Sequence, residues 1–168
     1  MASEAAGAPD AAGNQRDSWA PDDVFNAILR YSVVPTFDLI LEGIDGVLLV
    51  RRRISPYARL WALPGLRMHK GETLYECLSR IAHDEVGVQI DPYKGRFVNQ
   101  AVARFQTHQK RQDLSTCYAF NLEIDRVVLN AEHLSSWMFV RDLENIPDAI
   151  GGLYSDHLNR YFQTRGEE

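Results

Sequence analysis

The chain has 168 residues, of which 45% are hydrophobic and 24% charged, so its length and composition are those of one globular domain. Its formal net charge of −5 argues against general nucleic-acid binding, which needs a basic face, and no apolar run approaches the roughly 20 residues of a membrane span. Its two cysteines make no disulfide framework and its N-terminal stretch does not resemble a signal peptide, so we expect a cytoplasmic protein without nucleic-acid or membrane partners.

The N-terminal region divides into a tail and a first helix. Residues 1–19 are rich in Ala and Gly with few large apolar side chains, which predicts a disordered tail before a single domain of residues 20–168. Residues 20–30 predict a helix, because Pro21 suits the first helical position and two aspartates follow it at the positive end of the helix dipole. Its apolar residues recur at helical spacing and need something to cover them: Val24, Ala27, Ile28 and Tyr31.

The rest of the chain alternates strand-like and helical segments. Two apolar runs, 33–41 and 47–52, flank the turn signal Gly-Ile-Asp-Gly and predict a hairpin. Residues 73–86 predict a helix that ends at Gly87 and packs through Leu74, Leu78 and Ala82. The remaining expected elements are strands over 96–105, 114–124 and 137–140, a polar loop over 106–112 and a closing helix over 153–162. This order predicts an α+β sandwich with helices over a mixed sheet.

One segment resembles the signature of Nudix hydrolases. Residues 63–72 read Leu-Pro-Gly-Leu-Arg-Met-His-Lys-Gly-Glu and precede the helix that ends near residue 88. Four residues stand in the register of the family pattern: Glu72, Arg80, Glu85 and Gly87. Three positions depart from it, where a glycine and two glutamates are replaced by Leu66, Ile81 and Asp84. The resemblance implies a Nudix-type α/β/α sandwich with a mixed central sheet, and hydrolysis of a nucleoside diphosphate linked to another group.

The departures alter the metal site that the signature implies. A divalent cation held by carboxylates neutralises a diphosphate, and Mg²⁺ needs only one or two protein carboxylates. Positions 81 and 85 share a helix face, so Ile81 leaves Glu85 as the strongest ligand there. Asp84 points about 100° away and either supports the site or is a solvated helix residue. Glu72 and Arg80 are expected to form an ion pair that fixes the loop to the helix.

The chain is most similar to one branch of the family, the GDP-mannose mannosyl hydrolases, which also have an aliphatic residue at the first helix glutamate. The similarity runs over residues 23–162 and places functional positions of that branch on Asp38, Arg52, Gly65, Arg67, Glu132 and His133. Asp38 stands inside an apolar strand, where a carboxylate is costly to bury without partners. Arg52 is either the phosphate-binding arginine or the solvated end of a strand, with Arg51 and Arg53 on the opposite face.

The resemblance implies a mechanism. One Mg²⁺, or Mn²⁺ in its place, is held by the Gly65 carbonyl, Glu85 and Glu132, while Arg52 and Arg67 bind the departing nucleoside diphosphate. Water activated by His133 attacks the anomeric carbon of a nucleotide sugar, so the expected catalytic residues are His133, Arg67 and Asp38. The resemblance also implies a homodimer.

Three departures leave alternatives open. Leu66 reshapes the metal loop if its position needs a positive φ. Residues 106–112 differ from the corresponding family segment, so the contacts to sugar and base cannot be transferred. Tyr118 is either a core strand residue or the tyrosine of the family's site. A conventional pyrophosphohydrolase that attacks phosphorus, with Asp84 as a replacement ligand, is the first alternative function. A non-catalytic nucleotide-binding Nudix domain is the second.

Overall fold

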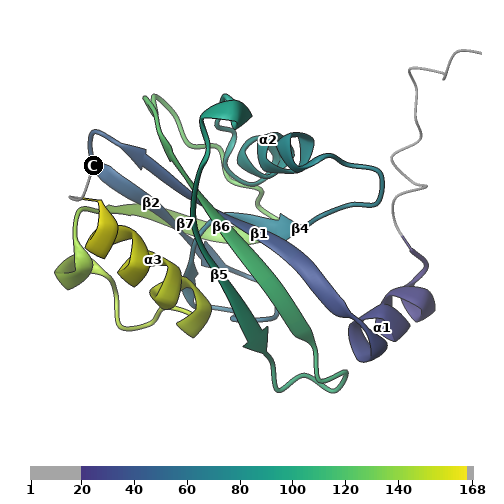
Figure 1. The fold of residues 1–168 in the computed structure, drawn as a ribbon. Coiled ribbons are helices and arrows are strands. Elements are labelled where there is room, and N and C mark those ends of the chain that lie inside the picture. Colours follow the sequence, from purple (N-terminus) through teal and green to yellow (C-terminus); the bar gives the residue numbers. More distant parts are fainter. Residues whose placement is uncertain (1–19, 166–168) are drawn as a thin grey trace, which may run out of the picture.

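The structure is a computed structural model that describes residues 20–165 (Figure 1). The predicted tail of residues 1–19 lies outside the described residues. The helices are α1 (Asp22–Tyr31), α2 (Leu74–Val86) and α3 (Gly152–Thr164), with short 3₁₀ helices η2 (Pro92–Lys94) and η3 (Leu143–Asn145). The strands are β1 (Val33–Gly43), β2 (Gly46–Arg52), β3 (Trp61–Ala62), β4 (Gly65–Arg67), β5 (Arg96–Arg104), β6 (Gln112–Asn121) and β7 (Leu134–Val140).

All the strands form one mixed sheet, in the order β3-β2-β1-β6-β5, with β4 paired to β1 and β7 paired to β2. The long strand β1 runs parallel to β6 along one edge, while β4 and then β2 pair antiparallel with its other edge. Helices α2 and α3 cover opposite faces of this sheet (Figure 1). The predicted α+β sandwich with a mixed central sheet is therefore confirmed, because both faces of the sheet are buried under helices.

The predicted hairpin forms at the expected turn. Glu42 pairs with Val47 and Gly43 with Gly46. Gly46 has φ +119°, and a Cβ added there would lie 2.4 Å from the carbonyl oxygen of Val140. The turn therefore requires glycine at this position for both its backbone conformation and its space.

Helix α2 begins and ends as its sequence signals indicate. Thr73 caps its N-terminus in a capping box with Glu76, and Gly87 ends it in the left-handed conformation with φ 68°. The predicted packing residues Leu78 and Ala82 are buried, while Leu74 is half-buried against the core. Ile81, which replaces a family glutamate, is 0% exposed and belongs to the hydrophobic core.

Some boundaries differ from the predicted ones. Strand β7 begins at Leu134, three residues before the predicted start, because its early residues pair with the end of β2. Strand β6 covers 112–121 instead of 114–124, and Pro21 is the N-cap of α1 and not its first helical residue. Strands β3 and β4 were not predicted, because two or three residues are too short to show a hydrophobic period.

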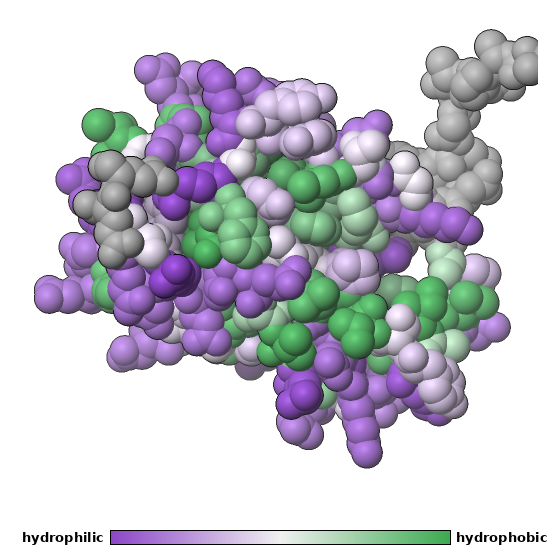
Figure 2. All heavy atoms as spheres, viewed as in Figure 1, coloured by the Kyte–Doolittle hydropathy of each residue, from purple (hydrophilic) through white to green (hydrophobic). Residues whose placement is uncertain are grey.

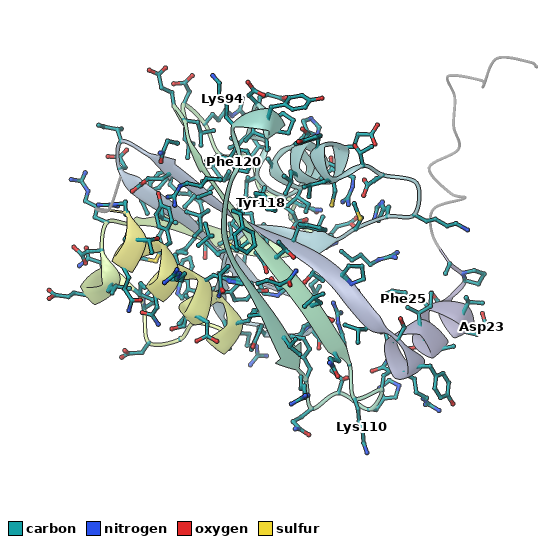
Figure 3. All side chains as sticks on the ribbon, viewed as in Figure 1. Asp23, Phe25, Lys94, Lys110, Tyr118 and Phe120 are labelled. Carbon is teal, nitrogen blue, oxygen red and sulfur yellow. The ribbon has the colours of Figure 1, made fainter. Side chains whose placement is uncertain are left out.

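Helix α1 lies at one end of the sheet with much of its apolar face uncovered. Leu29 is its buried residue, whereas Val24, Ile28 and Tyr31 are 45%, 39% and 81% exposed. Figure 2 shows apolar side chains on the surface in the region where α1 lies. Phe25 of α1 and Lys110 of the β5–β6 loop lie at the same end of the molecule (Figure 3). Asn26 and Gln109 join these two segments by a hydrogen bond of 2.8 Å.

Candidate active site

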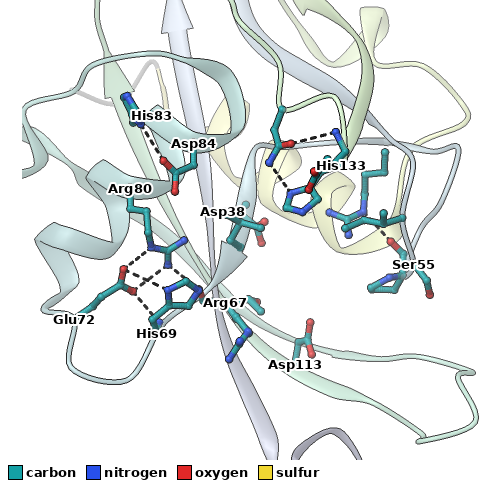
Figure 4. A pocket seen from close by; sticks show the side chains of 18 of the residues that line it. Asp38, Ser55, Arg67, His69, Glu72, Arg80, His83, Asp84, Asp113 and His133 are labelled. Atoms are coloured by element: carbon teal, nitrogen blue, oxygen red, sulfur yellow. Dashed lines mark hydrogen bonds and ion pairs between the residues drawn. The ribbon is translucent and has the colours of Figure 1, made fainter. Parts of the chain in front are cut away.

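A large cleft of about 1630 Å³ opens between α2, β4 and the ends of β1, β2 and β6 (Figure 4). The residues predicted for the site line this cleft, with the exception of Glu85: Asp38, Arg52, Gly65, Arg67, Glu132 and His133. The fold thus brings together residues that come from four separate parts of the sequence.

Asp38 and Gly65 are neighbours because β1 and β4 pair antiparallel with these two residues in register. A Cβ added to Gly65 would lie 1.9 Å from Asp38 Oδ1 and 2.9 Å from the carbonyl oxygen of Phe37. A side chain at position 65 would therefore require the Asp38 carboxyl group and the backbone of β1 to shift. Leu66 follows in β4 opposite Phe37, and it is not among the described residues with a positive φ. The condition under which Leu66 was expected to reshape the loop, a positive φ, is therefore not met.

Asp38 is 3% exposed and is held by a buried polar partner. Ser115 of β6 donates a hydrogen bond from Oγ to Asp38 Oδ2, and His157 Nε2 of α3 lies 3.7 Å from the same oxygen. Burial raises the pKa of Asp38 to about 7, although the Ser115 hydrogen bond and the charge of Arg52 act in the opposite direction. Burial lowers the pKa of His157 to about 4, so this histidine is neutral near pH 7.

Of the three consecutive arginines at the end of β2, Arg52 is the one that lines the cleft. Its Nε donates to the carbonyl oxygen of Pro56 at 2.8 Å, which orients the guanidinium. Arg51 and Arg53 are exposed and donate instead to the carbonyl oxygens of Arg59 and Leu134. Strand alternation predicted this division between the two faces.

Arg67, on β4, also lines the cleft. Its guanidinium carbon is 4.8 Å from the ring centre of Phe25, a cation–π contact that links β4 to α1. Burial lowers the pKa of Arg67, and the nearby charges of Arg80 and Arg111 act in the same direction. Even so, an arginine stays charged at neutral pH, so both Arg52 and Arg67 supply positive charge to the cleft.

The expected ion pair between Glu72 and Arg80 is present in the structure. Arg80 Nε donates to Glu72 Oε1, and its NH2 group donates to Glu72 Oε2 at 3.0 Å and to the carbonyl oxygen of Arg67 at 2.9 Å. The backbone N–H of His69 donates to Glu72 as well, at 2.7 Å (Figure 4). These contacts fix the loop between β4 and α2 against the helix.

Glu85 and His133 form a second pair at the other side of the cleft. Glu85 is 1% exposed, its Oε1 lies 2.6 Å from His133 Nδ1, and Asn130 Nδ2 lies 3.3 Å from the same oxygen. Asn130 Nδ2 also lies 3.2 Å from His133 Nδ1. The two contacts to Nδ1 exclude each other, because one needs a proton on this nitrogen and the other needs a lone pair. The shorter contact, to the carboxylate, assigns the proton to Nδ1.

The residues predicted to hold a metal ion differ in their surroundings. Gly65 and Glu132 line the cleft, Glu132 is exposed, and Glu85 lies beneath with Oε1 occupied by His133. Within residues 20–165 no group of three or more His, Cys, Asp or Glu side chains is placed to hold a metal. One or two carboxylates with a carbonyl nevertheless fit Mg²⁺, which takes its other ligands from water and phosphate. The oxygen donors present therefore suit such an ion.

Asp84, the other carboxylate near the predicted metal site, lies on the rim of the cleft. It is exposed, and His83 Nδ1 is 2.9 Å from its Oδ1. This geometry is compatible with both of its expected roles. Tyr118 is half-buried in β6 and does not line the cleft.

Several residues around the predicted site have no signal in the sequence. Ser115 of β6 and His157 of α3 contact Asp38. Asn130 contacts Glu85. Arg111 forms a two-point ion pair with the buried Asp113 on the cleft wall. Each is a polar residue without a local motif. Alternation along β6 could have pointed to Asp113 and Ser115, because both occupy inward positions of an apolar strand.

The sequence model of the NUDIX domain matches residues 33–154, and the chain belongs to the Nudix family. The low-salt glycan biosynthesis protein Agl8 of Haloferax volcanii is 28% identical over 129 residues, which cover 75% of this chain and 83% of Agl8. Among residues 20–165, none of the helices has the length and hydrophobicity of a membrane-spanning segment.

Several solved structures have the same fold. The MutT protein of Methanosarcina mazei Go1 matches with a TM-score of 0.69 and 18% identity, over 80% of this chain and 96% of that one. The Nudix domain of Shewanella oneidensis NrtR, crystallised with ADP ribose, matches with a TM-score of 0.63 and 19% identity, over 88% of this chain and 99% of that one. At these identities the likeness establishes the Nudix fold alone.

Proposed function

We propose that this protein hydrolyses a nucleoside diphosphate sugar of the GDP-mannose or GDP-glucose type by attack of water on the anomeric carbon, releasing the sugar and the nucleoside diphosphate. The observation that carries the proposal is the pairing of Glu85 with His133 while Ile81 is buried in the core. On the helix face that positions 81 and 85 share, α2 supplies one carboxylate, that of Glu85, and this carboxylate orients His133 on the cleft wall. This arrangement suits a protein base more than a set of carboxylates around a water-activating metal.

His133 is the proposed base. Its Nδ1–H donates to Glu85, so Nε2 carries the lone pair. Within residues 20–165, Nε2 has no hydrogen-bond partner, and the side chain lines the cleft. His133 can therefore take a proton from water at Nε2 while Glu85 stabilises the resulting cation.

Arg52 and Arg67 are the proposed ligands of the diphosphate. Their guanidinium groups offer paired N–H donors that match phosphate oxygens, and they stay charged throughout the neutral range. Mg²⁺ or Mn²⁺, when bound by the Gly65 carbonyl, Glu85 and Glu132, would add positive charge that stabilises the departing diphosphate. Asp38, whose pKa is raised to about 7 by burial, can donate a hydrogen bond to a substrate oxygen near neutral pH.

The relatives support a sugar nucleotide as the substrate class. Agl8 is named for glycan biosynthesis, and the NrtR Nudix domain was crystallised with ADP ribose, itself a nucleoside diphosphate joined to a sugar. The proposed homodimer draws support from the exposed apolar residues of α1.

The position of the attacked atom can be tested with ¹⁸O-labelled water. We expect the label in the released sugar when a panel of nucleotide sugars is hydrolysed in the presence of Mg²⁺ or Mn²⁺. His133→Gln should abolish most of the turnover, and His108→Gln is the matched control, since His108 is exposed and lies outside the cleft. Label in phosphate would refute the proposal.

Such a result would favour the conventional pyrophosphohydrolase, for which Asp84 on the cleft rim is the available extra carboxylate. Tight binding of nucleotide sugars with no turnover in either metal would instead favour a non-catalytic binding domain.

A further inference from the structure

A chain of hydrogen-bonded polar side chains, the first three of them buried, runs from the cleft into the body of the protein. Asp38 Oδ2 accepts a hydrogen bond from Ser115 Oγ, Ser115 Oγ lies 2.9 Å from His157 Nε2, and His157 Nδ1 lies 3.3 Å from Asn99 Nδ2. Ser115 and His157 are both 0% exposed. The four residues belong to β1, β6, α3 and β5, so the chain crosses from the sheet to the helix and back.

Each member is placed by a feature of the fold. Parallel pairing of β1 with β6 sets Thr36 beside Ser115 and Asp38 beside Cys117, so Ser115 and Asp38 face α3 together. Strand β5 has an irregular register between Phe97 and Asn99, which re-aims the side chain of Asn99. Helix α3 then brings His157 between them.

The direction of the hydrogen bonds follows from the chemistry of histidine. The pKa of His157 is lowered to about 4 by burial, so the ring is neutral and has one donor and one acceptor nitrogen. With the Asn99 amide N–H donating to Nδ1, the proton is on Nε2 and is donated to Ser115 Oγ. Ser115 in turn donates to Asp38. The two fully buried donors, Ser115 Oγ–H and His157 Nε2–H, each have an acceptor, which is the condition for burying these groups at small cost.

Within residues 20–165, Ser115 is the residue whose side chain donates a hydrogen bond to Asp38. Ser115 donates in this direction because its oxygen accepts the proton of His157 Nε2. The other carboxylate oxygen, Oδ1, lies against Gly65, and both residues line the cleft. We propose that Ser115 and His157 are positioning residues that fix the Asp38 carboxyl group so that Oδ1 faces the substrate. The kinetic part of this inference rests on the proposed function, whereas the structural part does not.

The first experiment measures turnover of a nucleotide sugar by purified full-length variants. We expect Ser115→Ala and His157→Asn to lower kcat about tenfold, with KM changed less than about twofold. The variant His157→Gln should keep most of the wild-type kcat, because the amide nitrogen of glutamine can take the place of Nε2 and donate to Ser115. His157→Asn cannot, because its amide reaches only the place of Nδ1.

Tyr161→Phe is the matched control. It removes another hydrogen bond between α3 and β1, from Tyr161 to Glu42, at a point away from Asp38. If Tyr161→Phe lowers kcat as much as Ser115→Ala does, the chain acts only by docking α3 and the inference is wrong. Equal activities of His157→Gln and His157→Asn would overturn it too.

The second experiment separates this inference from the proposed function. Crystal structures of Ser115→Ala and Tyr161→Phe should show the Asp38 carboxyl group rotated in the first and unchanged in the second. An unmoved Asp38 in Ser115→Ala overturns the positioning role, whatever reaction the protein catalyses. Where turnover is measurable, Ser115→Ala should have no further effect in an Asp38→Asn background, and independent losses would contradict the inference.

Discussion

The buried pair Asp38 and His157 makes a quantitative prediction about stability and pH. The pKa of Asp38 is raised from 3.8 to about 7, so between these values the folded protein binds more protons than the unfolded chain, and stability falls as pH rises. The pKa of His157 is lowered from 6.5 to about 4, so the folded protein binds fewer protons and stability rises with pH. In the wild type the two slopes oppose each other over pH 4–6.5.

Asp38→Asn removes one of the two slopes. Because the falling slope of Asp38 is missing, the variant gains about 3 kcal/mol of unfolding free energy from pH 4 to 6.5 relative to the wild type, at about 1.4 kcal/mol per pH unit, and the rising slope of His157 is then unopposed. The stabilisation from neutral His157 is complete above pH 6.5 and is lost as pH falls toward 4.

Urea denaturation at several pH values between 4 and 7, followed by tryptophan fluorescence, measures this difference. Shared titrations cancel when the wild type is subtracted from Asp38→Asn. The double variant Asp38→Asn with His157→Gln is the control and should lose the added slope. If Asp38→Asn and the wild type have parallel pH profiles, the assigned proton positions are wrong.

Three further predictions concern other parts of the structure. Gly65→Ala should reduce hydrolysis at least about tenfold, because its Cβ would lie 1.9 Å from Asp38 Oδ1 and force β4 away from β1; near-normal activity would refute the close approach. Arg80→Met should lower the unfolding free energy by about 1–3 kcal/mol in urea denaturation, since it leaves the half-buried Glu72 without its ion pair; an unchanged midpoint would contradict this. Ile28→Glu should convert the proposed homodimer to monomer in sedimentation analysis, because it places a charge on the exposed apolar face of α1; an unchanged mass would remove α1 from the interface.

The elements with strong local signals could be predicted from the sequence. The hairpin and α2 have turn glycines, a capping box and a clear hydrophobic period, and their bounds agree with the prediction to within about two residues. Strands β3 and β4 exist because β1 and β2 offer free edges, which is a tertiary cause with no local pattern. The same applies to the early start of β7.

The candidate site was predictable only where a residue carries a local or family signal. Strand alternation could separate Arg52 from its neighbours, and the family resemblance could place His133. Neither could show that Glu85 contacts His133, because that contact joins residues 48 positions apart. The bond between Ser115 and Asp38 spans 77 positions and depends on the parallel register of β1 and β6.

Helix α1 borders two regions at once. Phe25 contacts Arg67 at the cleft, while Ile28 and Tyr31 are exposed toward solvent. If two copies associate through these exposed residues, subunit association and nucleotide binding both act on the position of one short helix. The two equilibria would then be thermodynamically linked, so that substrate tightens the dimer by the same factor by which dimer formation tightens substrate binding.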